Sequence, residues 1–192
     1  MKGWIIKDGK LVFDENLRKP KIKKGWALVK VKVASLCGSD LGIIGGKMDV
    51  FNEGIVLGHE FAGTVENYDP SWKKNVDFKR KIISTIEIGQ KVAINPYIPC
   101  YKCRHCKAGR TNLCEKIKII GAHFHGGFGE YSLVPIENLI PIYGLPFKYA
   151  CLVQPVACAL SAVSKINLET LENKKNLDSR RRSDGTVYRT YC

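Results

Sequence analysis

The sequence predicts a mainly β domain of the α+β class, in which short strands form a compact, barrel-like sheet and one clear helix follows late. Three observations lead to this prediction. Short apolar runs are separated by Gly and Pro, four cysteines lie close together within the strand-rich part, and the first helical pattern begins only at Pro155. With 192 residues, of which 45% are hydrophobic, the chain can bury a core as one large domain or two small ones.

The N-terminal part is predicted to be strand-rich. Residues 1–13 predict a hairpin with a turn at Asp8-Gly9, and the Lys-rich residues 14–25 predict a loop. The segment from Trp26 to Val33 alternates between apolar and polar side chains, which predicts a half-buried strand. This strand leads to Cys37.

Two short segments carry side chains that bind metals. Cys37-Gly38-Ser39-Asp40 and Gly58-His59-Glu60 are predicted to be turn-like, and a strand is predicted to follow over Phe61 to Val65. A thiolate, an imidazole and a carboxylate are zinc ligands, and three protein ligands with one open position are typical of catalytic zinc. Cys37 and His59 are too far apart for a finger-type knuckle, so only the fold could bring them together. Taken alone, a His-Glu pair beside a glycine is also compatible with ordinary turn chemistry.

The rest of the chain continues the pattern of short elements. Residues 66–81 are polar and basic and predict an inserted surface loop. Further strands are predicted over residues 82–88, 91–94, 128–135 and 139–143. The helix is predicted to start with Pro155 in its first turn and to continue through Val156 to Val163.

The four clustered cysteines form a C-x2-C-x2-C-x7-C motif, made by Cys100, Cys103, Cys106 and Cys114. Two-residue gaps let thiolates converge on one ion, and four thiolates close a tetrahedral structural zinc site. An iron–sulfur cluster of the bacterial ferredoxin type would place the fourth cysteine after three residues and before Pro, whereas here the gap is seven and Glu115 follows. Reduced cysteines without a metal are the remaining alternative. His105 lies inside the motif, but four thiolates already complete a zinc site.

Charge and hydropathy favour a cytoplasmic protein. The N-terminus has no secretory apolar region, and the longest charge-free stretch, residues 149–164, is too short to span a membrane. The net charge of +13 raises the question of nucleic-acid binding, but residues 174–192 supply +4 of it, and the other basic residues are scattered. They are interpreted as a solvated face.

These motifs together resemble a known family, the zinc-dependent medium-chain alcohol dehydrogenases, which include polyol, threonine and sugar dehydrogenases. The resemblance covers residues 1–173 and rests on motifs that occur in the family's order: Cys37-Gly38-Ser39-Asp40, Gly58-His59-Glu60-Phe61-Ala62-Gly63, the four-cysteine lobe, Gly126-Gly127-Phe128-Gly129-Glu130-Tyr131 and Gln154-Pro155-Val156-Ala157. It implies a GroES-like partial β-barrel with a structural zinc lobe and a C-terminal helix. It also implies a small alcohol or polyol as substrate, NAD or NADP as cofactor, and homo-oligomers among the full-length relatives.

The resemblance also implies roles for single residues. Cys37 and His59 would hold the catalytic zinc, with Glu60 as a ligand or close neighbour, and Gln154 matches a position where family members carry Glu, Gln or Cys near the metal. Ser39 would take a proton from the alcohol, and Asp40 could accept the second imidazole N–H of His59. Ser39-Asp40 could instead be an ordinary turn or cap. Four further residues are interpreted as structural: the loop residues His123 and His125, and the core thiols Cys151 and Cys158.

The chain departs from this family in one respect. No G-x-G-x-x-G motif of a Rossmann domain occurs in it, so residues 1–173 are expected to form the catalytic domain and 174–192 a basic tail, with no residue assigned to cofactor binding. An alternative is a frameshift. From Asn176 onward, codons can be chosen that give Ile-Leu-Ile-Leu-Gly-Gly-Gly-Pro-Met-Gly when read one base later, a Rossmann strand with phosphate-binding glycines. The amino-acid sequence permits this reading without requiring it.

The sequence therefore predicts a truncated zinc-dependent alcohol or polyol dehydrogenase domain that is inactive on its own, because it has no site for the electron acceptor. Two other classes stay open. One is a non-catalytic zinc-binding interaction module, and the other is a basic zinc-ribbon nucleic-acid binder, which steep salt dependence of binding would reveal.

Overall fold

The computed structural model describes residues 1–47, 53–71 and 86–165. The chain divides into two compact units, Met1–Gln154 and Pro155–Cys192. The domain boundary predicted between residues 173 and 174, and the predicted tail, lie outside the described residues. Among the described helices, none is long and apolar enough to cross a membrane.

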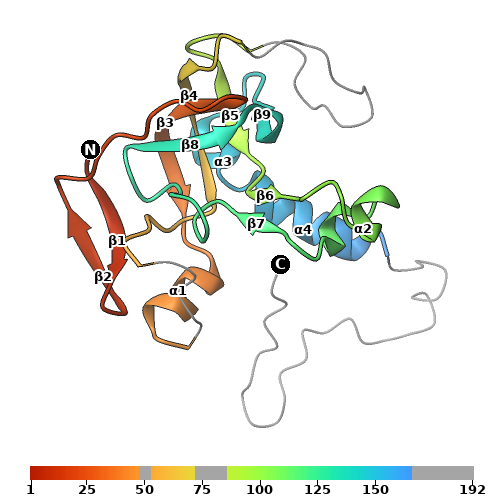
Figure 1. Cartoon of the computed structure of the whole chain (residues 1–192), viewed down its shortest axis with the longest axis horizontal. Helices are drawn as coiled ribbons and strands as arrows, with labels where there is room; N and C mark the ends of the chain where they lie inside the picture. Colours follow the sequence, from red (N-terminus) through yellow and green to blue (C-terminus); the bar gives the residue numbers. More distant parts are fainter. Residues whose placement is uncertain (48–52, 72–85, 166–192) are drawn as a thin grey trace. The chain divides into compact units, whose positions relative to one another are not determined.

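A five-stranded antiparallel sheet forms the centre of the first unit, with the strands in the order β8-β3-β4-β5-β9 (Figure 1). The bounds of these strands are β3 Trp26–Ser35, β4 Glu60–Tyr68, β5 Lys91–Ile94, β8 Tyr131–Pro135 and β9 Leu139–Pro141. The mainly β class predicted from the sequence is confirmed.

Two small antiparallel sheets accompany the large one. β1 (Gly3–Lys7) and β2 (Lys10–Asp14) form the predicted N-terminal hairpin. Asp8 and Gly9 turn the chain with φ angles of 50° and 68°, as a two-residue turn of type I′ requires. β6 (Tyr97–Ile98) and β7 (Lys118–Ile119) pair at the base of the cysteine motif.

The main apolar core lies against the five-stranded sheet. Val29 of β3 is fully buried whereas Lys30 is exposed, as the alternating pattern predicts. The pairing of β3 with β4 shifts register twice, between Leu28 and Val29 and between Val31 and Val33, and such bulges bend a strand. The buried residues of this core are Ala27, Val29, Phe61, Val65, Ile86, Val92, Ile94, Ile120, Val134, Ile136 and Leu139.

Several helical segments are present, with these bounds: α1 Gly38–Ile44, α2 Arg104–Lys107, the 3-10 turns Thr111–Leu113 and Ile136–Asn138, α3 Phe147–Ala150 and α4 Val153–Val163. The expectation that the first helix comes late was wrong, because the segment after Cys37 is helical and not turn-like. Ile43 of α1 is buried in a second apolar cluster with Ile6 and Leu57, and this packing stabilises a short helix despite its glycines.

Two predicted strands also differ. Of residues 82–88, only 86–88 are described, and they are not in a strand: Ile86 is buried in the core whereas Ile88 is 69% exposed. β8 starts at Tyr131 rather than at Phe128. The N–H groups of Gly127 and Phe128 donate to the carbonyls of Gly58 and Leu57, outside the sheet.

Candidate metal centres

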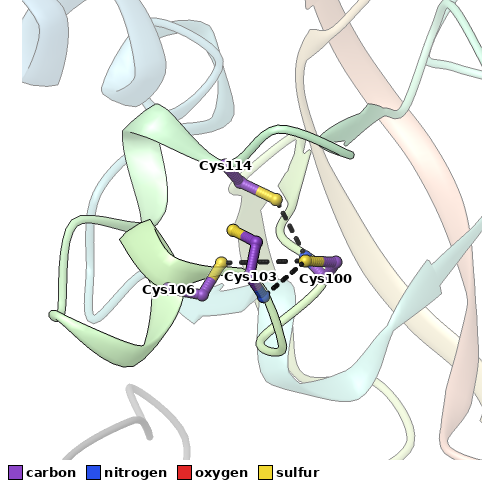
Figure 2. Close-up of side chains that lie close together, drawn as sticks. All are labelled: Cys100, Cys103, Cys106 and Cys114. Atoms are coloured by element: carbon purple, nitrogen blue, oxygen red, sulfur yellow. Dashed lines mark hydrogen bonds between the residues drawn. The ribbon is translucent and has the colours of Figure 1, made fainter.

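The cysteine motif folds into a lobe between β6 and β7. Its four sulfur atoms face one another (Figure 2) and all lie within 4.8 Å of one another. The Sγ atoms of Cys100 and Cys106 are 4.0 Å apart. Four sulfurs placed tetrahedrally at 2.3 Å from a zinc ion would be about 3.8 Å from one another. The lobe therefore fits a tetrahedral zinc ion, and its donors are those that structural zinc sites use.

The electrostatics of the lobe also suit a cation. Backbone N–H groups of Cys106 and Glu115 lower the pKa of Cys103 to about 6, which favours its thiolate form. Hydrogen bonds from Lys102 and Cys103 lower the pKa of Cys100. Burial, reinforced by the neighbouring thiols, raises the pKa of Cys106 to about 12. A metal that enters the lobe must displace the proton of Cys106.

His105 lies at the edge of this lobe. Its Nε2 atom is 3.8 Å from Oε1 of Glu115, and the same oxygen accepts a hydrogen bond from Nε of Arg104 at 3.1 Å. The structure thus gives His105 a carboxylate partner outside the four sulfurs.

A second group of donors forms where β3 and β4 meet. Cys37 immediately precedes α1, His59 precedes β4, and Glu60 is the first residue of β4. One ligand atom from each of these three residues lies within 4.8 Å of the others, and Glu60 is buried. The fold therefore brings together two segments that are about twenty residues apart in the sequence.

Asp40 joins the two segments. It is 1% exposed, and its Oδ2 atom accepts the backbone N–H of Cys37 at 2.9 Å. Its Oδ1 atom lies 3.5 Å from Nδ1 of His59. A carboxylate beside one imidazole nitrogen leaves the other nitrogen, Nε2 of His59, for a metal.

Sequence reasoning missed Ser35. Its hydroxyl donates to Oε2 of Glu60 at 2.6 Å, because the two residues are direct partners in the register of β3 and β4. Only this register reveals the contact, so nothing in the sequence could have indicated it. Ser39 lies in the first turn of α1 and is partly exposed.

Gln154 is the last residue of the first unit, near the start of α4, and is buried. Its Nε2 atom donates to the phenol oxygen of Tyr97 at 3.2 Å. The preceding residue, Val153, packs against an apolar cluster formed by Ala62, Ala93, Ile142 and Ala150. Ala62 is two residues beyond Glu60 in the same strand.

The loop histidines have structural contacts. Nδ1 of His125 accepts the backbone N–H of Val56 at 3.1 Å, and Nδ1 of His123 accepts that of Ile119 at 3.1 Å. Burial lowers the pKa of both imidazoles. The two histidines line a cavity of about 580 Å³ together with Trp26 and Phe124, but none of the predicted zinc ligands lines it.

Within the described part of the chain, Cys151 and Cys158 lie outside both groups and take no part in a metal cluster. Cys151 is buried, and its thiol donates to the carbonyl of Lys148 at 3.4 Å. Cys158 lies in α4, within the second unit.

The chain matches a known domain family and known proteins. Residues 23–144 match the model of the alcohol dehydrogenase GroES-like domain. The chain is 40% identical over 139 residues to L-galactonate-5-dehydrogenase of Escherichia coli (strain K12), a match that covers 72% of this chain and 38% of the relative.

Two solved structures resemble the fold. Galactitol-1-phosphate dehydrogenase from Escherichia coli superposes with a TM-score of 0.70 at 30% identity, over 84% of this chain and 44% of the other. Acetophenone reductase from Geotrichum candidum, solved in complex with NAD, gives a TM-score of 0.70 at 29% identity, over 86% of this chain and 48% of the other.

The chain thus spans less than half the length of these relatives. The matched region contains Cys37, His59, Glu60 and all four cysteines of the lobe. The chain belongs to the family of zinc-type medium-chain alcohol dehydrogenases and carries their N-terminal GroES-like domain.

Proposed function

We propose that this chain is the zinc-binding catalytic half of an NAD(P)-dependent dehydrogenase that oxidises a small alcohol or polyol to a carbonyl compound. One observation carries the proposal: donor atoms of Cys37, His59 and Glu60 converge within 4.8 Å from two separate segments. Three protein donors leave a fourth position for substrate, whereas the closed lobe of four thiolates is of the structural kind.

In this proposal Cys37, His59 and Glu60 would hold the catalytic zinc. The neutral amide oxygen of Gln154 would be a weak ligand at the fourth position, from which the substrate oxygen can displace it. When bound, zinc supplies Lewis-acid activation of the substrate hydroxyl. Oδ1 of Asp40 lies 3.5 Å from Nδ1 of His59, which leaves Nε2 to bind the zinc in this proposal.

Two further groups complete the proposed chemistry. The Oγ atom of Ser39 accepts the proton that leaves the alcohol and passes its own hydroxyl proton on to solvent, because this residue is partly exposed. The hydride would leave the alcohol carbon for a nicotinamide. The sequence holds no G-x-G-x-x-G motif, so we propose that the nicotinamide site lies outside these 192 residues.

The zinc content of the purified chain tests the two centres. We expect elemental analysis to find two zinc ions per wild-type chain. The Cys37→Ser variant and the Cys103→Ser variant should each bind one zinc ion. Cys151→Ser is the matched control and should still bind two. If the wild-type chain binds one zinc ion and Cys37→Ser still binds one, the proposed zinc site at Cys37, His59 and Glu60 is contradicted. That result would favour a non-catalytic zinc-binding module.

Activity is tested by joining the chain to a cofactor-binding half. The purified chain with NAD and a polyol is expected to yield no NADH. A chimera that joins this chain to the unmatched part of acetophenone reductase from Geotrichum candidum, which was solved in complex with NAD, is expected to reduce NAD, and Cys37→Ser should abolish that activity. A chimera that binds two zinc ions and NAD but oxidises none of a panel of alcohols and polyols would refute the proposed reaction.

A further inference from the structure

Tyr97 and Gln154 are joined by a hydrogen bond inside the first unit. Tyr97 begins β6, the strand that leads into the cysteine lobe, and its phenol oxygen accepts Nε2–H of Gln154 at 3.2 Å. Gln154 is 6% exposed. The amide nitrogen of this buried glutamine therefore has a hydrogen-bond acceptor within the first unit.

Tyr97 lies at the same end of the sheet as the second group of donors. β4 and β5 run antiparallel with Ala62 opposite Ala93, so the chain beyond Ile94 continues toward the end where β4 begins with Glu60. The carbonyl of Pro96 accepts the N–H of Ile120.

A close backbone contact completes this connection. A Cβ atom on Gly121 would lie 2.6 Å from the carbonyl oxygen of Gly58, which directly precedes His59. Pro96, next to Tyr97, is thus hydrogen-bonded to Ile120, and the following residue, Gly121, packs against the residue before His59.

The two ends of an amide side chain differ in what they can bind. The carbonyl oxygen has lone pairs for a cation, whereas the NH₂ group only donates hydrogen bonds. When Oε1 of Gln154 faces a metal, the amide nitrogen points away from it and needs an acceptor, since a buried donor without a partner is costly. The phenol oxygen of Tyr97 supplies this acceptor.

We propose that Tyr97 is a positioning residue for the catalytic metal centre. Its hydroxyl holds the amide nitrogen of Gln154 so that the carbonyl oxygen serves as a ligand. This inference rests on the proposed function, because it requires a metal at Cys37, His59 and Glu60. Mutation of a residue that hydrogen-bonds to a metal ligand typically lowers the metal affinity 10- to 100-fold.

The test uses the full 192-residue chain and measures zinc affinity at each centre by chelator competition. Tyr97→Phe keeps the ring and deletes only the hydroxyl, and it is expected to lower the affinity of the catalytic centre about 10- to 100-fold. The affinity of the cysteine lobe should stay unchanged. Tyr143→Phe is the matched control, because it deletes the hydroxyl of a 90% exposed tyrosine.

A double-mutant cycle separates positioning from general loss of structure. In a Gln154→Leu background, Tyr97→Phe is expected to have no further effect on zinc affinity, since the ligand that Tyr97 orients is already gone. Equal losses in both backgrounds, or an affinity of Tyr97→Phe within twofold of wild type, would overturn the inference and leave the proposed function intact. A wild-type chain that binds zinc only in the lobe would refute both.

Discussion

Oδ1 of Asp40 lies 3.5 Å from Nδ1 of His59, while Oδ2 of the same carboxylate accepts the backbone N–H of Cys37. One buried side chain therefore contacts both segments that supply the donors of the second centre. Because Asp40 is itself the third residue of α1, the position of His59 is tied to the start of that helix. Asp40 therefore adds a side-chain link between Cys37 and His59 to the backbone pairing of β3 with β4.

Asp40→Asn tests this arrangement. Asparagine can still accept the N–H of Cys37, but it removes the negative charge beside His59. We expect the zinc affinity of the second centre to fall about 10- to 100-fold with the lobe unaffected, as measured by chelator competition. Glu15→Gln, which neutralises an exposed carboxylate paired with Lys2, is the control and should leave both affinities unchanged. Equal affinities in Asp40→Asn and wild type would show that the carboxylate does not orient the imidazole.

Gly126→Ala tests how the loop after β7 supports His59. A Cβ atom on Gly126 would collide with the carbonyl oxygen of Gly58 and would lie 2.7 Å from that of Leu57. The backbone before His59 must then move, and we expect a loss of about 1–3 kcal/mol in the free energy of unfolding, together with weaker zinc binding at the second centre.

Gly129→Ala is the matched control for this change. Its Cβ atom would meet nothing closer than Cγ1 of Val56, at 3.3 Å. Urea denaturation followed by fluorescence measures both variants. A Gly126→Ala chain as stable as Gly129→Ala would contradict the close packing of this loop.

His125 gives the stability a dependence on pH. Burial lowers its pKa below the value of about 6.5 that it has in the unfolded chain. A lowered pKa means that the unfolded state binds more protons, so the contribution to stability is complete above pH 6.5 and is lost as the pH falls through the folded-state pKa. We expect the free energy of unfolding to decrease between pH 7.5 and 5.5.

Urea denaturation at several pH values checks this expectation. His125→Asn keeps an acceptor for the N–H of Val56 but does not titrate, so its stability should fall less steeply over the same window. The pKa of His123 is also lowered by burial. We therefore expect the stability of His125→Asn to keep a weaker dependence on pH. Identical slopes in wild type and His125→Asn would exclude His125 as a source of the dependence.

The sequence was sufficient for features that depend on residue chemistry and short spacing. The four-cysteine lobe and the turn at Asp8-Gly9 were predicted because each is signalled by residue types that have few other uses at that spacing. The grouping of Cys37 with His59 and Glu60 was predicted from their metal-binding side chains and from the resemblance to a known family, not from their spacing. The strand that begins at Trp26 was predicted because its apolar and polar side chains alternate with the period of two of a half-buried strand.

Features that depend on pairing between distant segments were not predictable. The contact of Ser35 with Glu60 follows from the register of β3 and β4, which two bulges shift. The helix α1 contains glycines that disfavour helices in isolation, and it forms where Ile43 can be buried. Tyr97 gave no signal in the sequence, because its role depends on a hydrogen bond to a residue 57 positions later.

The pairing of β3 with β8 has a consequence for the order of folding. It places Trp26 opposite Pro135, so forming this pair closes a very long loop, and such non-local pairings slow the search for the native state. The cysteine lobe lies within that loop. Zinc that binds early would tether Cys100 to Cys114 and shorten the effective length of chain to be closed. Because loop-closure entropy grows slowly with length, removing about 14 of about 109 residues lowers the free-energy cost of closure by only about 0.1 kcal/mol. The metal therefore stabilises the lobe without setting the pace at which the sheet assembles.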